Sequence, residues 1–128
     1  MSKAEKIFDA MSEAVKGSEG KSLHRKFKGS VIFTISTTNE SYILDLKKAN
    51  SDGNFYVAKL DDNSKPKVDL HVTVSEDDMM KLLQKKLNPQ QAFMSGKLKI
   101  KGKMALAMKL NAVLASTSKH MGPILSKL

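Results

Sequence analysis

The side chains best suited to acid–base chemistry or metal binding are scattered along this sequence. Its three histidines, His24, His71 and His120, lie far apart. Asp69 and His71 stand two residues apart in an alternating segment, a spacing that places both on the outward face of a strand. We interpret these two residues as a surface pair and not as part of a catalytic arrangement.

No other pattern predicts catalysis. The carboxylate pair 61–62 falls among turn-forming residues and the pair 77–78 at an expected helix start, so neither predicts general acid–base chemistry. The chain has no cysteine, and therefore no thiolate nucleophile, thiolate metal site or disulfide. The G-x-S-x-G, H-E-x-x-H, G-x-G-x-x-G and P-loop patterns are missing from the sequence. We predict that the protein is not an enzyme and uses no cofactor or metal.

Composition indicates one folded domain with a strongly basic character. The 128 residues are 41% hydrophobic and 27% charged, as in ordinary globular proteins. The sequence lacks a secretory signal and any run of 18 apolar residues, so we expect a soluble protein that is not secreted. The net charge is +9, yet Arg25 is the only arginine among 22 basic residues. Since arginine is the usual residue for reading bases and phosphates, the charge favours general attraction over sequence recognition.

Hydrophobic periodicity predicts the elements that precede residue 75. Residues 4–15 have helical spacing, and Gly17 and Gly20 end that helix before a basic connector with a short helical turn. Four alternating segments, 30–38, 41–48, 55–60 and 67–74, are joined by turns rich in Asn, Asp, Ser and Gly. They predict an antiparallel meander with one buried face. In its third strand the expected inward residues are Tyr56, Ala58 and Leu60.

Helical spacing returns after the fourth strand. Ser75 and Asp78 form a capping-box pattern, and Asn88-Pro89 predicts a second short helix that ends at Gly96. Residues 97–101 then predict a fifth strand, whose lysines on one face would protect a sheet edge. The predicted fold class is α+β, a five-stranded, mainly antiparallel sheet flanked by about five helices.

The closing helix is predicted to be apolar on two sides. Four bulky residues share one side: Leu106, Leu110, Val113 and Leu114. Five Met and Ala residues share the other: Met104, Ala105, Met108, Ala112 and Ala115. A helix with two apolar sides must be covered twice. Either more protein covers the second side, or that side lines a cavity for an apolar ligand, for which Met and Ala are well suited.

The segment LNPQQAFMSGKLKIKGKMALAMKL, residues 87–110, resembles the C-terminal signature of the sterol carrier protein 2 family. The order of the predicted elements is also similar to that fold across nearly the whole chain. The last three residues, Ser126, Lys127 and Leu128, match a peroxisomal targeting signal. The resemblance implies a non-enzymatic carrier with a hydrophobic tunnel between sheet and helices. Such a carrier would bind fatty acids, fatty acyl-CoA, sterols or phospholipids and deliver them within or to peroxisomes.

The predicted lipid contacts come from two sources. The resemblance assigns seven lining residues: Phe93, Met94, Leu98, Ile100, Met104, Met108 and Ala112. The residue pattern adds five more: Phe33, Ile35, Leu44, Met80 and Leu83. Arg25, Gln90 and Gln91 are candidate head-group contacts.

The expected organisation is a lipid-binding domain over residues 1–119 and a tail over 120–128. The expected partners are a lipid, the peroxisomal import receptor and, transiently, a membrane. The expected location is the peroxisome, with the cytoplasm as a second. An alternative without an internal ligand stays open, namely a basic module that binds nucleic acid or an anionic membrane surface. Lys97, Lys99, Lys101 and Lys103 could follow phosphates, but their segment lacks aromatic stacking groups.

Overall fold

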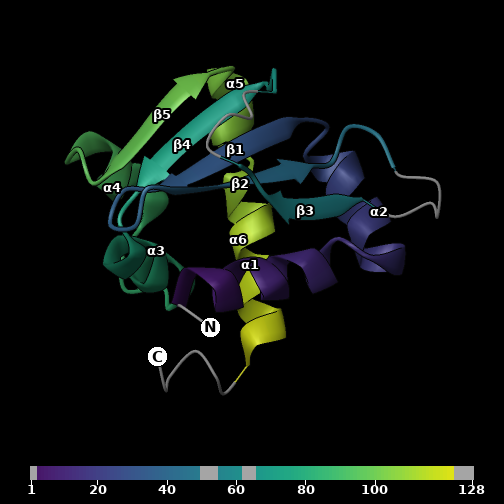
Figure 1. Cartoon of the computed structure of the whole chain (residues 1–128), viewed down its shortest axis with the longest axis horizontal. Coiled ribbons are helices and arrows are strands. Elements are labelled where there is room, and N and C mark those ends of the chain that lie inside the picture. The colour runs from purple at the N-terminus through teal and green to yellow at the C-terminus, as the bar shows by residue number, and fades with distance from the viewer. Residues whose placement is uncertain (1–2, 50–54, 62–65, 123–128) are drawn as a thin grey trace.

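The computed structural model describes residues 3–49, 55–61 and 66–122 (Figure 1). The described residues form six helical segments and five strands. The helices are α1 (Lys3–Ala14), α2 (Gly17–Lys26), α3 (Glu76–Leu83), α4 (Pro89–Met94), α5 (Met104–Ala107) and α6 (Leu110–Met121). The strands are β1 (Ser30–Ile35), β2 (Glu40–Asp45), β3 (Tyr56–Lys59), β4 (Leu70–Val74) and β5 (Leu98–Gly102). The predicted targeting signal at residues 126–128 lies outside the described residues.

The strands form one mixed sheet in the order β3-β2-β1-β4-β5. The predicted antiparallel meander is confirmed for β1, β2 and β3, but β4 lies on the other side of β1 and runs parallel to it, with Val31 opposite Leu70. β5 then pairs antiparallel with β4 and is an edge strand. The prediction for β4 was wrong because alternation shows which residues are buried and carries no information on the neighbouring strand.

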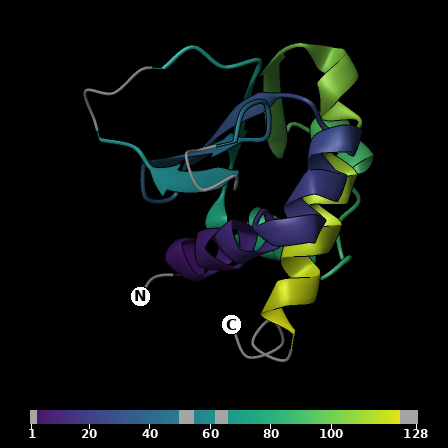
Figure 2. The same cartoon turned by 90° about the vertical axis from the view of Figure 1, so that its right-hand side faces the viewer.

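Helices cover one face of the sheet, so the fold has two layers (Figures 1 and 2). α6 runs across the middle of this layer, and α1 packs against both α6 and β3. Phe8 of α1 stacks on Tyr42 of β2 with ring centroids 4.0 Å apart. The core lies between the layers, where Phe33 and Leu44 are fully buried.

Two predicted helix starts are confirmed by their capping bonds. The Ser75 hydroxyl accepts the Asp78 N–H at 3.1 Å, and the Asn88 side-chain oxygen accepts the Gln90 N–H at 2.8 Å. These side chains satisfy N–H groups that have no partner within the helix. The connector, in contrast, contributes to a ten-residue helix, α2, which begins at Gly17 and contains Gly20, so these glycines belong to the second helix and only a short turn was predicted there.

The third strand buries the opposite face from the one predicted. Leu44 is paired with Val57, and Ile43 with Ala58. Val57 therefore shares the helix-covered face and packs against the core, while Tyr56 and Ala58 are exposed. The short run around Tyr56 is apolar at most positions, so its periodicity fits either face.

The closing segment is two helices instead of one. α5 is a single turn and α6 begins at Leu110, with Met108 and Lys109 between them. α6 buries Leu110, Val113 and Leu114, whereas Met104 and Met108 stay exposed. The second apolar side of this segment is therefore not covered by the described part of the chain.

The Asp69 side chain joins three parts of the sheet. Its carboxylate accepts the Ser30 N–H at 3.2 Å and lies 3.2 Å from the Lys103 ammonium and 3.5 Å from that of Lys47. Only 10% of the side chain is exposed, and His71 is exposed, so the predicted Asp69–His71 surface pair is wrong. Burial raises the pKa of Asp69, but the Ser30 N–H and the two ammonium groups outweigh it, and the net pKa is lowered.

We expect Asp69→Asn to lower the free energy of unfolding by about 1.5–3 kcal/mol near pH 7, the range for a hydrogen bond to a charged group. Because the folded-state pKa is lowered, this stabilisation exists above the unfolded-state pKa of about 4 and disappears as pH falls through the folded-state value. Urea unfolding of wild type and variant between pH 2.5 and 7 measures the difference. Asp61→Asn, at an exposed position, is the control. A difference that does not change with pH would contradict the assignment.

Candidate functional site

An apolar cavity of about 320 Å³ lies beneath the β4–β5 side of the sheet. Its lining consists of thirteen apolar residues and two amides. They are Phe33, Val72, Met79, Leu82, Pro89, Gln90, Phe93, Leu98, Ile100, Met104, Ala107, Met108, Leu110, Asn111 and Leu114. The volume is at the lower end of the roughly 300–1,000 Å³ usual for small-molecule sites.

The sheet forms one wall of this cavity and helices form the others. Phe33, Val72 and Ile100 lie side by side on neighbouring strands, because β1 pairs with β4 and β4 with β5 in that register. The alternation of β5 turns Leu98 and Ile100 to the cavity, and Lys99 and Lys101 to the other face. Side chains of α3, α4, α5 and α6 complete the enclosure.

The cavity opens to solvent between α4 and α5. Phe93 of α4 is 41% exposed, and Met104 and Met108 of the α5 segment are 45% and 83% exposed, although all three line the cavity. Large apolar side chains gathered at one exposed rim are typical of a site that takes up an apolar partner. We call this opening, framed by Phe93, Met104 and Met108, the mouth.

The lining contains no ionisable side chain. Gln90 and Asn111 are its only polar side chains, and both are exposed. Among the described residues, no cluster of three or more His, Asp or Glu side chains is arranged to hold a metal ion. A lining of this kind removes alkyl groups from water and offers amide hydrogen bonds at its rim.

The structure brings together about half of the predicted lipid contacts. Seven line the cavity: Phe33, Gln90, Phe93, Leu98, Ile100, Met104 and Met108. Four are buried in the core away from it: Ile35, Leu44, Met80 and Leu83. Ala112 is partly buried against the core, and Met94, Arg25 and Gln91 are exposed without lining the cavity.

Eight lining residues were not in the predicted set: Val72, Met79, Leu82, Pro89, Ala107, Leu110, Asn111 and Leu114. Of these, Leu110 and Leu114 were predicted to lie on the bulky apolar side of the closing helix. Ala107 lies on the single turn α5 with Met104, which also lines the cavity.

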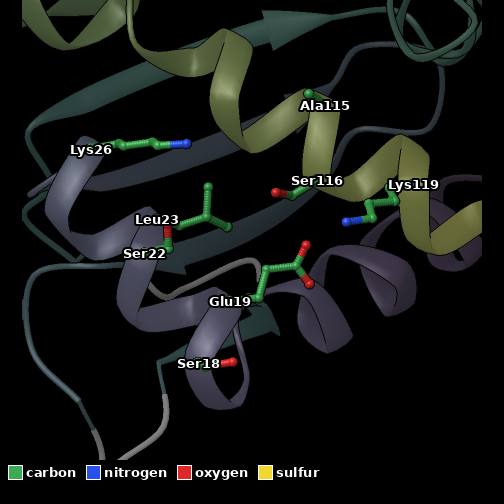
Figure 3. Close-up of a pocket in the computed structure, with 8 residues that line it drawn as sticks. All are labelled: Ser18, Glu19, Ser22, Leu23, Lys26, Ala115, Ser116 and Lys119. Carbon is green, nitrogen blue, oxygen red and sulfur yellow. The ribbon is translucent and has the colours of Figure 1, made fainter.

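A second hollow, of about 560 Å³, lies between α2 and α6 (Figure 3). Figure 3 shows the side chains of Lys26, Ser116 and Lys119 extending into the space between the two helices. Glu19, which also lines it, bonds His120. Because most of its lining is charged or hydroxylated, this hollow cannot desolvate an alkyl chain, and the smaller apolar cavity is the better candidate site.

The mixed sheet, covered on one face by helices with an apolar cavity between the layers, defines an α+β domain with an internal apolar site. Residues 8–115 match the SCP-2 sterol transfer family. The chain belongs to this family, whose domain is a lipid-binding and lipid-transfer fold.

Known proteins support this assignment at the levels of sequence and structure. The peroxisomal multifunctional enzyme A of Dictyostelium discoideum is 38% identical over 113 residues, which cover 87% of this chain and 24% of that protein. The apo structure of sterol carrier protein 2 from Yarrowia lipolytica has a TM-score of 0.71 at 27% identity, covering 88% of this chain and 89% of the other. The solution structure of palmitated SCP2L2 from Aedes aegypti has a TM-score of 0.63 at 27% identity, covering 87% of this chain and 93% of the other. The chain thus spans about a quarter of the length of the Dictyostelium relative.

The described helices give no candidate for a membrane-spanning segment, since none combines the necessary length and apolarity.

Proposed function

We propose that this protein is a carrier that holds the alkyl part of a fatty acid, or of a related lipid such as an acyl-CoA, sterol or phospholipid, in the cavity. The observation that carries the proposal is a lining of thirteen apolar side chains without an ionisable group, open at a rim of exposed Phe and Met. The palmitated state of the Aedes aegypti relative supports a fatty acid as the first ligand to test.

The energetics of such binding are favourable without any specific polar contact. Removing one methylene from water contributes about 0.8 kcal/mol, so a dozen buried groups contribute on the order of 10 kcal/mol. Association itself costs about 4–15 kcal/mol, so at the low end of this cost about 6 kcal/mol remains, which corresponds to a Kd of tens of micromolar. Broad selectivity follows, because an apolar wall discriminates weakly between similar apolar molecules.

Two amides at the rim are the head-group contacts that we propose. Gln90 and Asn111 both line the cavity and are exposed, so they can donate to a carboxylate or ester oxygen while the alkyl chain stays inside. Arg25 and Gln91 lie outside the lining, so they are not among the proposed head-group contacts.

We further propose that the carrier is not itself an enzyme and acts in peroxisomes. The name of the Dictyostelium relative supports this location. The sequence Ser126-Lys127-Leu128 has the form that the peroxisomal import receptor binds.

We expect the purified protein to bind one fluorescent fatty acid saturably, with a Kd of about tens of micromolar or below. The Kd should change less than about threefold between 50 and 500 mM NaCl, because burial of alkyl groups releases no counterions. Fluorescence titration, with native mass spectrometry for stoichiometry and co-purified lipid, makes the measurement. If fatty acid fails to bind while duplex DNA binds with a steep salt dependence, the carrier proposal is wrong and the nucleic-acid alternative is favoured.

A further inference from the structure

The methionine side chains of the described residues differ sharply in exposure. The sequence has eight methionines and no cysteine, so thioethers are the only sulfur groups of this chain. Four described methionines are at most 5% exposed: Met11, Met79, Met80 and Met121. Three are 45–83% exposed: Met94, Met104 and Met108. A water-soluble oxidant can therefore reach these three in the folded protein, whereas a buried methionine reacts only after local opening.

The three exposed methionines all belong to the two helical segments that frame the mouth, but only two of them line the cavity. Met104 and Met108 are four positions apart on the α5 segment, a spacing that places both on one side of the helical turn. Met94 ends α4, directly after Phe93, and does not line the cavity. The mouth thus combines two methionines that a bound alkyl chain would contact with a third that it would not.

Hydrogen peroxide converts a thioether to a sulfoxide without help from any titratable group. The sulfur forms a bond to one peroxide oxygen, the O–O bond breaks, and the other oxygen leaves as water with both hydrogens. Sulfur is oxidised by two electrons, and the peroxide is reduced by two. The product carries a polar S=O group in place of a flexible apolar side chain. Oxidation therefore changes the polarity of a methionine-lined site while its net charge stays the same.

We propose that Met104 and Met108 are a site of oxidation by hydrogen peroxide, and that sulfoxide formation there weakens lipid binding in the cavity. The lining offers a sulfoxide oxygen no ionisable partner, and its two amides are exposed. A sulfoxide that stays in the lining is desolvated against the alkyl chain, and one that turns outward withdraws its contact surface from the ligand. Both arrangements lower the affinity. The oxidation site rests on exposure, whereas its effect on lipid rests on the proposed function.

Bound lipid should protect this site. An alkyl chain in the cavity covers side chains of the lining, so Met104 and Met108 should oxidise more slowly in protein saturated with fatty acid. Met94 lies outside the lining and should oxidise at the same rate in both states. An empty carrier would then lose affinity on exposure to peroxide, while a loaded one would keep its ligand.

The oxidation rates are measured on the full chain, with and without saturating fatty acid. The protein is treated with dilute hydrogen peroxide, quenched and digested with trypsin, and each sulfoxide is quantified by mass spectrometry. Cleavage after lysine gives separate peptides for Met94 (87–97), for the α5 pair (104–109) and for the buried Met11 (7–16). Without fatty acid, the first two peptides should oxidise at least about tenfold faster than the third, since Met11 must first be uncovered by local opening.

Leucine variants test the effect on binding. Leucine is similar to methionine in size and apolarity but has no sulfur to oxidise. Peroxide should raise the Kd for a fluorescent fatty acid at least about fivefold in wild type and in Met94→Leu, the matched control, because one unpaired polar group in an apolar site has at least that cost. It should leave the Kd of Met104→Leu/Met108→Leu within twofold. Methionine sulfoxide reductases should restore the wild-type Kd, and urea unfolding shows that the oxidised protein stays folded.

An equal loss of affinity in Met104→Leu/Met108→Leu would overturn the inference, and so would oxidation of Met11 as fast as that of the α5 pair. A Kd that stays the same when both α5 methionines are fully oxidised would also overturn it. The untreated protein separates the two proposals. If it binds fatty acid and oxidation has no effect, only this inference is wrong. If it binds no fatty acid, the carrier function is wrong.

Discussion

Ala107→Phe is expected to weaken fatty-acid binding about 50-fold. Ala107 lines the cavity from the single turn of α5, and a phenyl ring at this position occupies space that the alkyl chain would fill. Exclusion of about three methylenes, at about 0.8 kcal/mol each, gives about 2.4 kcal/mol, which corresponds to that factor. The measurement is the titration of a fluorescent fatty acid, with urea unfolding to show that the variant stays folded.

Ala105→Phe is the control for this substitution. Ala105 belongs to the same helical turn but is exposed and does not line the cavity, so the same added ring should leave the Kd within about twofold. If both variants bind fatty acid as wild type does, the ligand does not occupy this cavity.

Gly102→Ala should destabilise the protein by about 3–4 kcal/mol. Gly102 ends β5 with φ of +118°, a conformation that L residues rarely adopt, and a Cβ there would lie 2.3 Å from the Asp69 carbonyl oxygen. The Lys103 N–H donates to that carbonyl at 2.9 Å, so the oxygen cannot move away without loss of a bond. Backbone strain and overpacking each cost about 1–3 kcal/mol. Urea unfolding followed by circular dichroism measures the loss.

Gly96→Ala separates strain from steric overlap. Gly96 has φ of +81°, but an added Cβ there would have no atom within 4 Å. This variant should lose only about 1–2 kcal/mol, the cost of a left-handed backbone. Equal losses at positions 96 and 102 would show that the close approach of Gly102 to β4 contributes nothing.

Local features of the fold could be predicted because local sequence determines them. Ser75 and Asn88 start helices because their side chains accept hydrogen bonds from backbone N–H groups in the first helical turn. The partner of β4 could not be predicted, since the pairing of Val31 with Leu70 joins segments 39 positions apart in the sequence. The prediction of the buried face of β3 was wrong because Tyr56, Val57 and Ala58 place apolar side chains on both faces of the strand.

For the candidate site, the signature segment was more informative than the alternation of the strands. Five of its seven assigned residues line the cavity, namely Phe93, Leu98, Ile100, Met104 and Met108, whereas Met94 and Ala112 do not. Strand alternation predicted the buried faces of β1, β2 and β4 correctly, but it did not distinguish a residue that packs against helices, such as Ile35, from one that lines the cavity, such as Phe33. That distinction depends on the break between helices α5 and α6 at Met108 and Lys109. The position of this break depends on packing between several elements and cannot be predicted from one segment.

The order of the strands has a consequence for biosynthesis. The residues that enclose the cavity run from Phe33 to Leu114, so the enclosure can form only after Leu114 has left the ribosome. Until then, the side chains that line the cavity are available to chaperones. Pairing of β1 with β4 joins segments 39 positions apart, and a domain of this topology is expected to fold in milliseconds or longer. A cell would therefore load the cavity only after Leu114 has been synthesised.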